Sequence, residues 1–115
     1  EEELKSIKKR AQTELLPALR LRAAQMGLEA GRVSFRFQKG RFGSCSSRGN
    51  INFNCLLVLM PPDLWDYVIV HELCHIRHPD HSPAFWKEVE KYCPAYKTLR
   101  NETQKQGAEL IARLP

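Results

Sequence analysis

Apolar residues recur at steps of three and four along residues 3–26, the spacing that places side chains on one face of an α-helix. Gly27 follows this stretch and provides a natural C-terminal stop. Pro17 lies inside it, and because proline removes a backbone donor we expect either a kink or a break into two helices there. The chain is therefore predicted to begin with a long amphipathic helix.

The pattern then changes to a strict alternation of apolar and polar residues, which is typical of half-buried β-strands. It occupies residues 33–37, 42–46 and 51–55, and the last strand is expected to continue to Leu59. Gly49 lies between the second and third strands and can adopt a positive φ, so these two strands are predicted to form a hairpin. We expect a small three-stranded sheet of the antiparallel type.

Helical spacing returns in the second half of the chain. One helix is expected from Asp63, which can cap it, to about His78. Ser82 followed by Pro83 is the preferred order for the start of another helix. A last helical stretch is expected from Pro94 toward the C-terminus. Together these elements predict an α+β fold.

Length and composition fit one domain spanning residues 1–115, because 43% of the 115 residues are apolar. The longest apolar run, Cys55 to Met60, is too short for a membrane helix. The chain opens on glutamates without a methionine or a signal peptide, and we expect a fragment that lacks an N-terminal extension. The widely spaced cysteines are expected to be reduced thiols of a cytoplasmic protein: Cys45, Cys55, Cys74 and Cys93.

The chain is moderately basic, with a net charge of +5 and a pI near 9.2. A clustered charge would indicate affinity for phosphate groups. The basic residues are scattered along the chain, which favours a solvated basic surface. A weak association with nucleic acid through this surface stays open.

The candidate chemistry lies in the run His71-Glu72-Leu73-Cys74-His75, which is H-E-x-x-H on a predicted helix. Residues at i and i+4 share one helical face, so the two imidazoles can bind one zinc ion. Glu72 projects from an adjoining face, where it can act as general base on a metal-bound water. We expect this arrangement to hydrolyse peptide bonds.

A catalytic zinc site needs a third protein ligand, and His81 is the candidate. It lies after Pro79, which ends the helix, and before the Ser82 cap, so the chain can turn back toward the metal. His78 competes for this place, but its position at the helix end favours an interaction with the helix dipole. Cys74 lies about 100° around the helix from His75, which argues against its thiolate as a ligand.

The sequence from Arg41 to Arg100 resembles a known family. It reads RFGSCSSRGNINFNCLLVLMPPDLWDYVIVHELCHIRHPDHSPAFWKEVEKYCPAYKTLR and is similar to the YgjP-like metallopeptidase domain, a bacterial zincin related to SprT-like and WLM proteases. That family shares an R-W-G-S-C-S hairpin entry, an N-x-N strand, a D-Y-V-x-x-H-E-L-x-H helix and an N-H-S-x-x-F-W segment. Phe42 stands where the family usually has Trp, and Asp80 where it has Asn.

The resemblance implies a minimal zincin-like fold with a Zn²⁺ ion on His71, His75 and His81 and with Glu72 as the catalytic residue. Asp80 would then be placed to accept a hydrogen bond from a ligand imidazole. The resemblance also implies that an extended polypeptide substrate pairs with an exposed edge strand, for which residues 51–59 are the candidate.

Two interpretations follow. The first is a zinc-dependent metallopeptidase. The alternative is a binding or regulatory module that zinc stabilises, associated with DNA-bound protein complexes as the SprT-like relatives suggest. Glu72 separates the two, because a purely structural zinc site has no need of a carboxylate at that position. Phe85 and Trp86 are expected to pack in the core under the metal helix, rather than to form a substrate wall.

Overall fold

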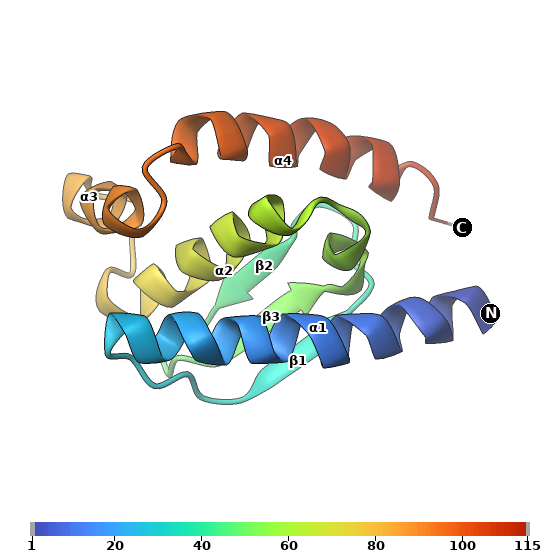
Figure 1. Cartoon of the computed structure of the whole chain (residues 1–115), viewed down its shortest axis with the longest axis horizontal. Coiled ribbons are helices and arrows are strands. Elements are labelled where there is room, and N and C mark those ends of the chain that lie inside the picture. Colours follow the sequence, from blue (N-terminus) through green and yellow to red (C-terminus); the bar gives the residue numbers. More distant parts are fainter. Residues whose placement is uncertain (1, 115) are drawn as a thin grey trace.

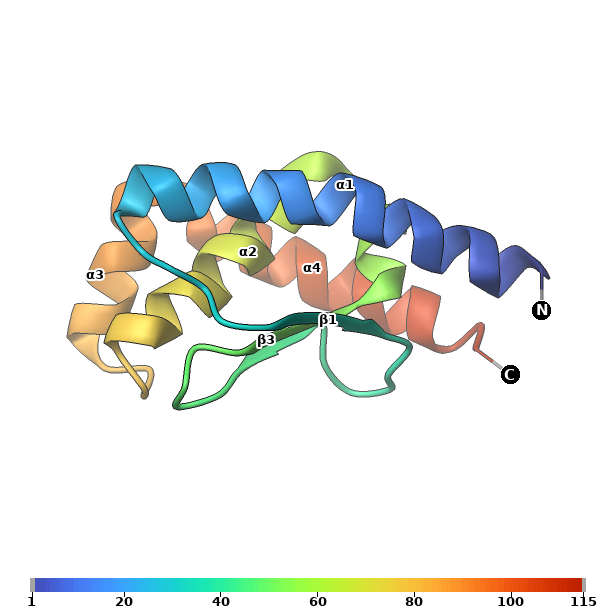
Figure 2. The same ribbon diagram turned by 90° about the horizontal axis from the view of Figure 1, so that it is seen from below.

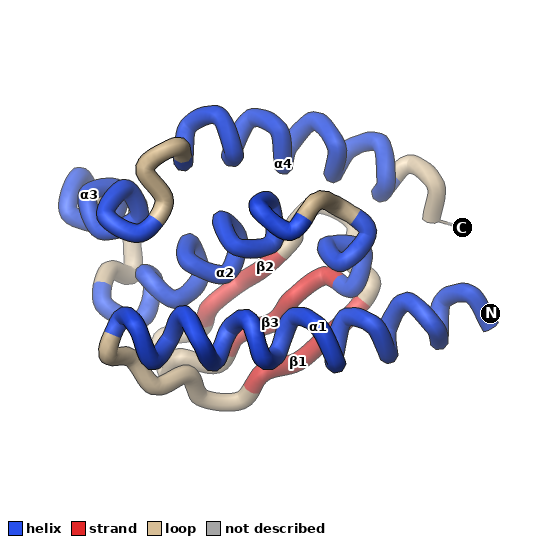
Figure 3. The backbone as a smooth tube through the Cα atoms, in the orientation of Figure 1, coloured by secondary structure: helices blue, strands red, loops and turns tan. Residues whose placement is uncertain are grey.

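Four α-helices and a small sheet make up the computed structural model, which describes residues 2–114 (Figure 3). In chain order the elements are α1 (Glu2–Met26), β1 (Val33–Arg36), β2 (Gly43–Cys45), β3 (Ile51–Asn54), the 3₁₀ helix η1 (Cys55–Leu59), α2 (Pro62–Arg77), α3 (Pro83–Tyr92) and α4 (Tyr96–Ile111). The predicted α+β class is confirmed. Within this part of the chain, no helix is long and apolar enough to cross a membrane.

Helix α1 is continuous through Pro17, which excludes a break into two helices, one of the two outcomes expected there. Its buried stripe packs against η1 and α2, and it comprises Ala11, Leu15, Leu19, Ala23 and Met26. Each buried leucine contributes about 1.5–3 kcal/mol, which together offsets the roughly 3 kcal/mol cost of an internal proline. The helix ends at Met26, directly before Gly27, as predicted.

The sheet is mixed, which corrects the expectation of an antiparallel one. Its strand order is β1-β3-β2. Strands β2 and β3 form the predicted antiparallel hairpin, with Ser44 opposite Asn52. Strand β1 pairs with β3 in parallel, with Val33 opposite Ile51. Alternation of apolar and polar residues reports which side of a strand is buried, and it carries no information on the direction of the partner strand.

The third strand ends at Asn54 rather than at Leu59, because the Asn54 side chain starts a different element. Its carboxamide oxygen accepts a hydrogen bond from the backbone N–H of Leu56 at 3.0 Å and caps η1. Strand β3 also lies in the middle of the sheet. Residues 51–59 are therefore not an exposed edge strand, and that expectation is wrong.

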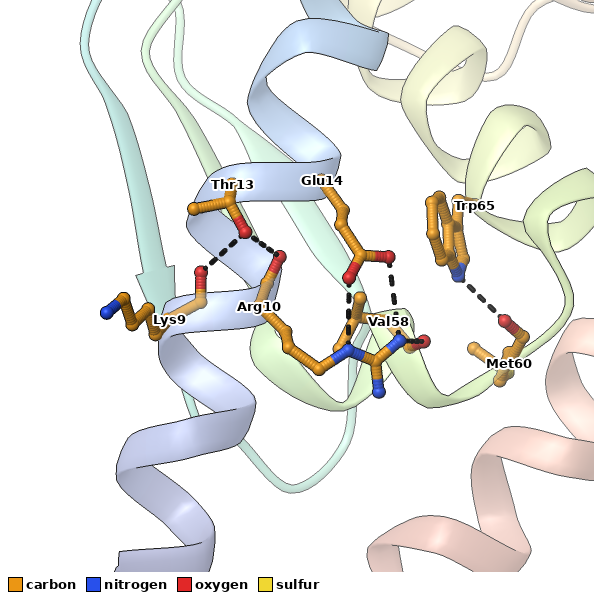
Figure 4. Close-up of polar contacts among 7 residues, drawn as sticks. All are labelled: Lys9, Arg10, Thr13, Glu14, Val58, Met60 and Trp65. Carbon is orange, nitrogen blue, oxygen red and sulfur yellow. Dashed lines mark hydrogen bonds and ion pairs between the residues drawn. The ribbon is translucent and has the colours of Figure 1, made fainter.

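Helix η1 is held between α1 and α2 by polar contacts that Figure 4 shows. The indole N–H of Trp65 donates to the carbonyl of Met60 at 2.8 Å. On the other side, the Arg10 guanidinium donates to the carbonyl of Val58 at 3.4 Å and pairs with Glu14 at 3.0 Å. The 3₁₀ turn thereby fixes where α2 begins.

Helix α2 is the central element of the fold. Figure 1 shows α1 and α4 on opposite sides of it, and Figure 2 shows that α1 and α2 cover the same face of the sheet. It begins at Pro62 with Pro61 as N-cap, so the prediction of Asp63 as cap is wrong. Proline in the first turn has no N–H that would need a partner, which makes a side-chain cap dispensable there.

An ion pair links α1 to α2. Arg22 donates two hydrogen bonds of 2.7 Å to the carboxylate of Asp66, and a third of 3.1 Å to the carbonyl of Tyr92 at the end of α3. The carboxylate holds the pKa of Arg22 above its ordinary value. The four cysteines are free thiols, as expected.

Candidate metal centre

The last turns of α2 carry the H-E-x-x-H residues. His71 and His75 are half-buried, and Glu72 between them is only 6% exposed. The helix is apolar upstream, with Leu64, Ile69 and Val70 in the core, so the packing of α2 fixes the direction of all three side chains. The buried helix therefore presents a carboxylate and two imidazoles at one end.

The turn between α2 and α3 returns His81 to this end of α2. Helix α2 ends at Arg77, and the Ser82 hydroxyl caps α3 by accepting from the backbone N–H of Phe85 at 3.3 Å, as the sequence predicts. The Nε2 atom of His81 lies 3.1 Å from Nε2 of His75 and 3.3 Å from Nε2 of His71. The candidate ligand atoms of the three imidazoles all lie within 4.8 Å of one another.

This donor set fits a divalent metal ion. The Nδ1 atom of His75 lies 2.9 Å from the carbonyl of His78, which can only accept, so Nδ1 carries the proton and Nε2 presents a lone pair. The Nδ1 atom of His71 lies 3.3 Å from the Tyr67 hydroxyl. Two nitrogens bound to one tetrahedral zinc at about 2.0–2.1 Å lie about 3.3 Å apart, which matches the observed spacing.

Aromatic rings surround the imidazoles. Phe85 is fully buried and stacks on His75, with ring centroids 4.5 Å apart. Trp86 is only half-buried, stacks on His81 on one side and on Tyr96 on the other, and lines the groove beside the site. The expectation of a core residue is confirmed for Phe85, whereas Trp86 also forms a wall of the groove.

Burial controls the protonation of the site. It lowers the pKa of His71 to about 3, with His75 and His81 lowering it further, so that imidazole is neutral. Burial raises the pKa of the Glu72 carboxyl to about 7, and the charge of Arg41 opposes this rise. A neutral imidazole is the form that ligates a metal, and a carboxyl with a pKa near neutrality can both take up and release a proton.

Strand β2 approaches Glu72 closely. A Cβ atom added to Gly43 would lie 2.9 Å from both Cγ and Oε2 of Glu72. Only glycine leaves room for this approach, which brings the edge of the sheet against the end of α2. The glycine of the RFGSCS motif is thus explained by the Glu72 side chain, which lies where a Cβ atom would be.

A groove of about 760 Å³ opens beside the imidazoles and Glu72. The residues before and at the start of β2 form one wall, and α3 and α4 form the other. The two walls meet where the Phe42 ring lies against Gly107 of α4, since a Cβ there would be 2.2 Å from the ring. The groove lies next to the candidate metal centre.

Three other candidates from the sequence lie outside the cluster. The His78 ring is turned toward α3, with Nε2 3.0 Å from the Glu88 carboxylate, and its backbone carbonyl contacts His75. Cys74 is fully buried in the core. Asp80 is exposed and makes no hydrogen bond to an imidazole within residues 2–114; its charge only offsets part of the lowering of the His81 pKa.

Sequence reasoning missed two residues that support the site. Tyr67 contacts His71 from one helical turn earlier. Its position four residues before His71 could have indicated this contact from the sequence. Asn54 is 1% exposed, and its amide donates to the carbonyls of Gln38 at 2.7 Å and Arg41 at 3.1 Å. These bonds fix the loop that forms one wall of the groove, a role that no local pattern indicates.

Comparison with known proteins shows the family and the fold of the chain. The family model of the YgjP-like metallopeptidase domain matches residues 2–106. No curated protein matches the chain in sequence. The metallopeptidase zymogen of Pyrococcus abyssi abylysin has a similar fold, with a TM-score of 0.72 and 23% identity over 80% of this chain and 93% of that one. The metallopeptidase zymogen of Methanocaldococcus jannaschii jannalysin also has a similar fold, with a TM-score of 0.67 and 19% identity over 84% of this chain and 95% of that one. The chain belongs to the YgjP-like metallopeptidase domain family.

Proposed function

We propose that this metallopeptidase domain hydrolyses extended polypeptide with a zinc ion held by His71, His75 and His81 and with Glu72 as general base. The family implies a divalent metal. The observation that carries the proposal is the convergence of the Nε2 atoms, at 3.1 and 3.3 Å, beside a buried carboxyl and an open groove. Three imidazoles without cysteine leave a coordination position free, which is the pattern of a catalytic zinc site.

When bound, the metal supplies a Lewis acid that makes water a nucleophile at neutral pH. Glu72 takes the proton from the attacking water and passes it to the leaving amine. Its burial suits both steps, because the raised pKa allows proton uptake and proton release near neutral pH. Gly43 keeps the space around this carboxyl, and Phe85 excludes water from the far side of the imidazoles.

Two contacts orient the ligands. The His78 carbonyl accepts from Nδ1 of His75, and the Tyr67 hydroxyl lies beside Nδ1 of His71. Such contacts fix the tautomer and the ring orientation, and their loss weakens metal binding about 10–100-fold in comparable sites.

Strand β2 is a better candidate than β3 for pairing with an extended substrate, because β3 lies in the middle of the sheet. It contacts only β3 in the sheet, so its other edge has no partner strand within residues 2–114. Its first residue, Gly43, lines the groove next to Glu72. An extended peptide added to this edge would pass beside the metal centre, held by main-chain hydrogen bonds.

The test combines a metal analysis with proteolysis of an unfolded protein substrate. Wild type and Glu72→Gln should each carry about one zinc per chain, whereas only wild type should cleave. A chelator should abolish cleavage, and added zinc should restore it. His75→Ala, as the matched ligand variant, should lose the metal. Protein prepared without chelators that holds no stoichiometric zinc, or a Glu72→Gln variant that cleaves at the wild-type rate, would overturn the proposal.

The alternative of a zinc-stabilised module is not favoured, because the candidate ligands are three imidazoles beside a groove rather than a closed set of four. The same experiment separates the two. A module would unfold on removal of zinc and would cleave nothing in either form.

A further inference from the structure

Three basic side chains line the groove beside the metal centre. They are Arg41, before β2, and Lys97 and Arg100, on α4. Glu72 is the one carboxylate among the lining residues. Within residues 2–114, none of the three basic side chains lies within ion-pair distance of a carboxylate. The groove therefore has an excess of positive charge that the fold does not neutralise.

Arg100 lies beside the aromatic rings that surround the imidazoles. Its guanidinium carbon is 5.3 Å from the centre of the Trp86 ring, which itself stacks on His81. An arginine stacked on an aromatic ring keeps its N–H donors free and loses little side-chain entropy when it binds an anion.

Arg41 and Lys97 add charge from two sides. The backbone carbonyl of Arg41 accepts a hydrogen bond from the buried amide of Asn54, which holds the loop that carries this residue. Lys97 precedes Arg100 by three residues on α4, which places both on one face of the helix. A ligand in the groove would meet basic groups from α4 and from the β2 side.

We propose that the groove selects substrates that carry a carboxylate, either a Glu or Asp side chain or the free C-terminus, and that Arg100 is the main specificity-determining residue. This rests on the proposed peptidase function. A guanidinium binds a carboxylate through two parallel hydrogen bonds, and the exposed side chain of Arg100 is accessible to such a ligand. A substrate with a basic residue at the same place would be repelled by the three basic side chains.

A peptide-derived carboxylate fits better than a nucleic-acid phosphate. Phosphate backbones are bound by basic groups repeated along a surface. Here the three basic groups gather around one groove of about 760 Å³, and Glu72 lies among them. The occupant of the groove is therefore expected to bring a single negative group.

Binding is measured with fluorescent extended peptides and the Glu72→Gln variant, which is expected not to cleave them. The peptides carry Glu or Gln at one central position, and each is made with a free or an amidated C-terminus. We expect the preferred acidic peptide to bind about threefold to tenfold more tightly than its neutral partner, with the preference weaker at high salt. The Glu/Gln pair and the acid/amide pair distinguish the two sources of the carboxylate.

Arg100→Gln should abolish that preference, and Arg100→Glu should reverse it in favour of a Lys peptide. Lys105→Gln, which removes an exposed charge on α4 outside the groove, should leave it unchanged. Equal binding of acidic and neutral peptides, or a preference that survives Arg100→Gln, would overturn the inference while leaving the proposed function intact. Competition by a single-stranded oligonucleotide that exceeds competition by the acidic peptide would also overturn it. If the wild-type protein does not cleave but the binding preference is observed, that result would contradict the proposed function alone.

Discussion

Basic side chains in two regions of the molecule have different surroundings. Those that join helices have carboxylate partners: Arg22 pairs with Asp66 between α1 and α2, and Arg77 pairs with Glu88 between α2 and α3. Those in the groove, Arg41, Lys97 and Arg100, have none within the described chain. Paired charges hold helices in register, whereas unpaired ones around a cavity are available to a ligand.

The comparison separates stability from function. Substitutions in the groove and metal centre should change catalysis or binding with little effect on the free energy of unfolding. Substitutions at the paired ions should do the reverse. The expected effects decrease from the centre of the site outward.

Among variants that leave Glu72 and the three histidines in place, the largest effect is expected for Gly43→Ala. The added Cβ would lie 2.9 Å from Cγ and Oε2 of Glu72, so the carboxyl has to move. A displacement of about 1 Å from productive geometry costs about a hundredfold in rate, and we expect a loss of that size in kcat at unchanged zinc content. Ser44→Ala, at the next residue of the same strand, is the control and should keep nearly full activity. Equal kcat for the two variants would show that Glu72 can move without cost.

Tyr67→Phe should weaken zinc binding by about tenfold, because the hydroxyl that orients His71 is lost while the buried ring remains. Competition with a chromogenic chelator measures the change. Tyr96→Phe removes a hydroxyl from the same groove, where Tyr96 stacks on Trp86, and should leave the affinity unchanged. If both variants bind zinc like wild type, Tyr67 has no orienting role.

Arg22→Met should lower the free energy of unfolding by about 1 kcal/mol, because it removes charge-assisted hydrogen bonds to a partly exposed carboxylate. The activity of the folded protein should not change. Arg20→Met, on the exposed side of α1, should leave stability near wild type. Chemical denaturation and kinetics on both variants test this, and a large loss of activity in Arg22→Met would contradict the separation of the two regions.

The smallest effect is expected for Arg10→Ala. Its pair with Glu14 spans one turn of α1 and is exposed, so its loss should lower stability by about 0.3–0.5 kcal/mol (Figure 4). High salt should reduce the difference from wild type, since exposed pairs are screened. A salt-independent loss would instead indicate the hydrogen bond from Arg10 to the Val58 carbonyl.

Much of the fold could be predicted from local sequence patterns. The apolar spacing predicted α1, and the Ser82-Pro83 pair predicted the start of α3 at its observed residue. The errors have physical causes. Asn54 competes with the strand by capping η1, a side-chain interaction that alternation does not reveal. Pro17 is tolerated in α1 because burial of the helix offsets its cost.

The sequence by itself determined the family and the candidate residues His71, Glu72, His75 and His81, because helical spacing and a proline-terminated turn are local constraints. The tertiary structure decided what surrounds them. It placed β2 rather than β3 at the sheet edge beside Glu72, and it closed the groove with α4. It also brought Arg41 and Arg100 to the same cavity. These contacts join residues far apart in the chain, so packing of the elements, rather than any local pattern, sets them.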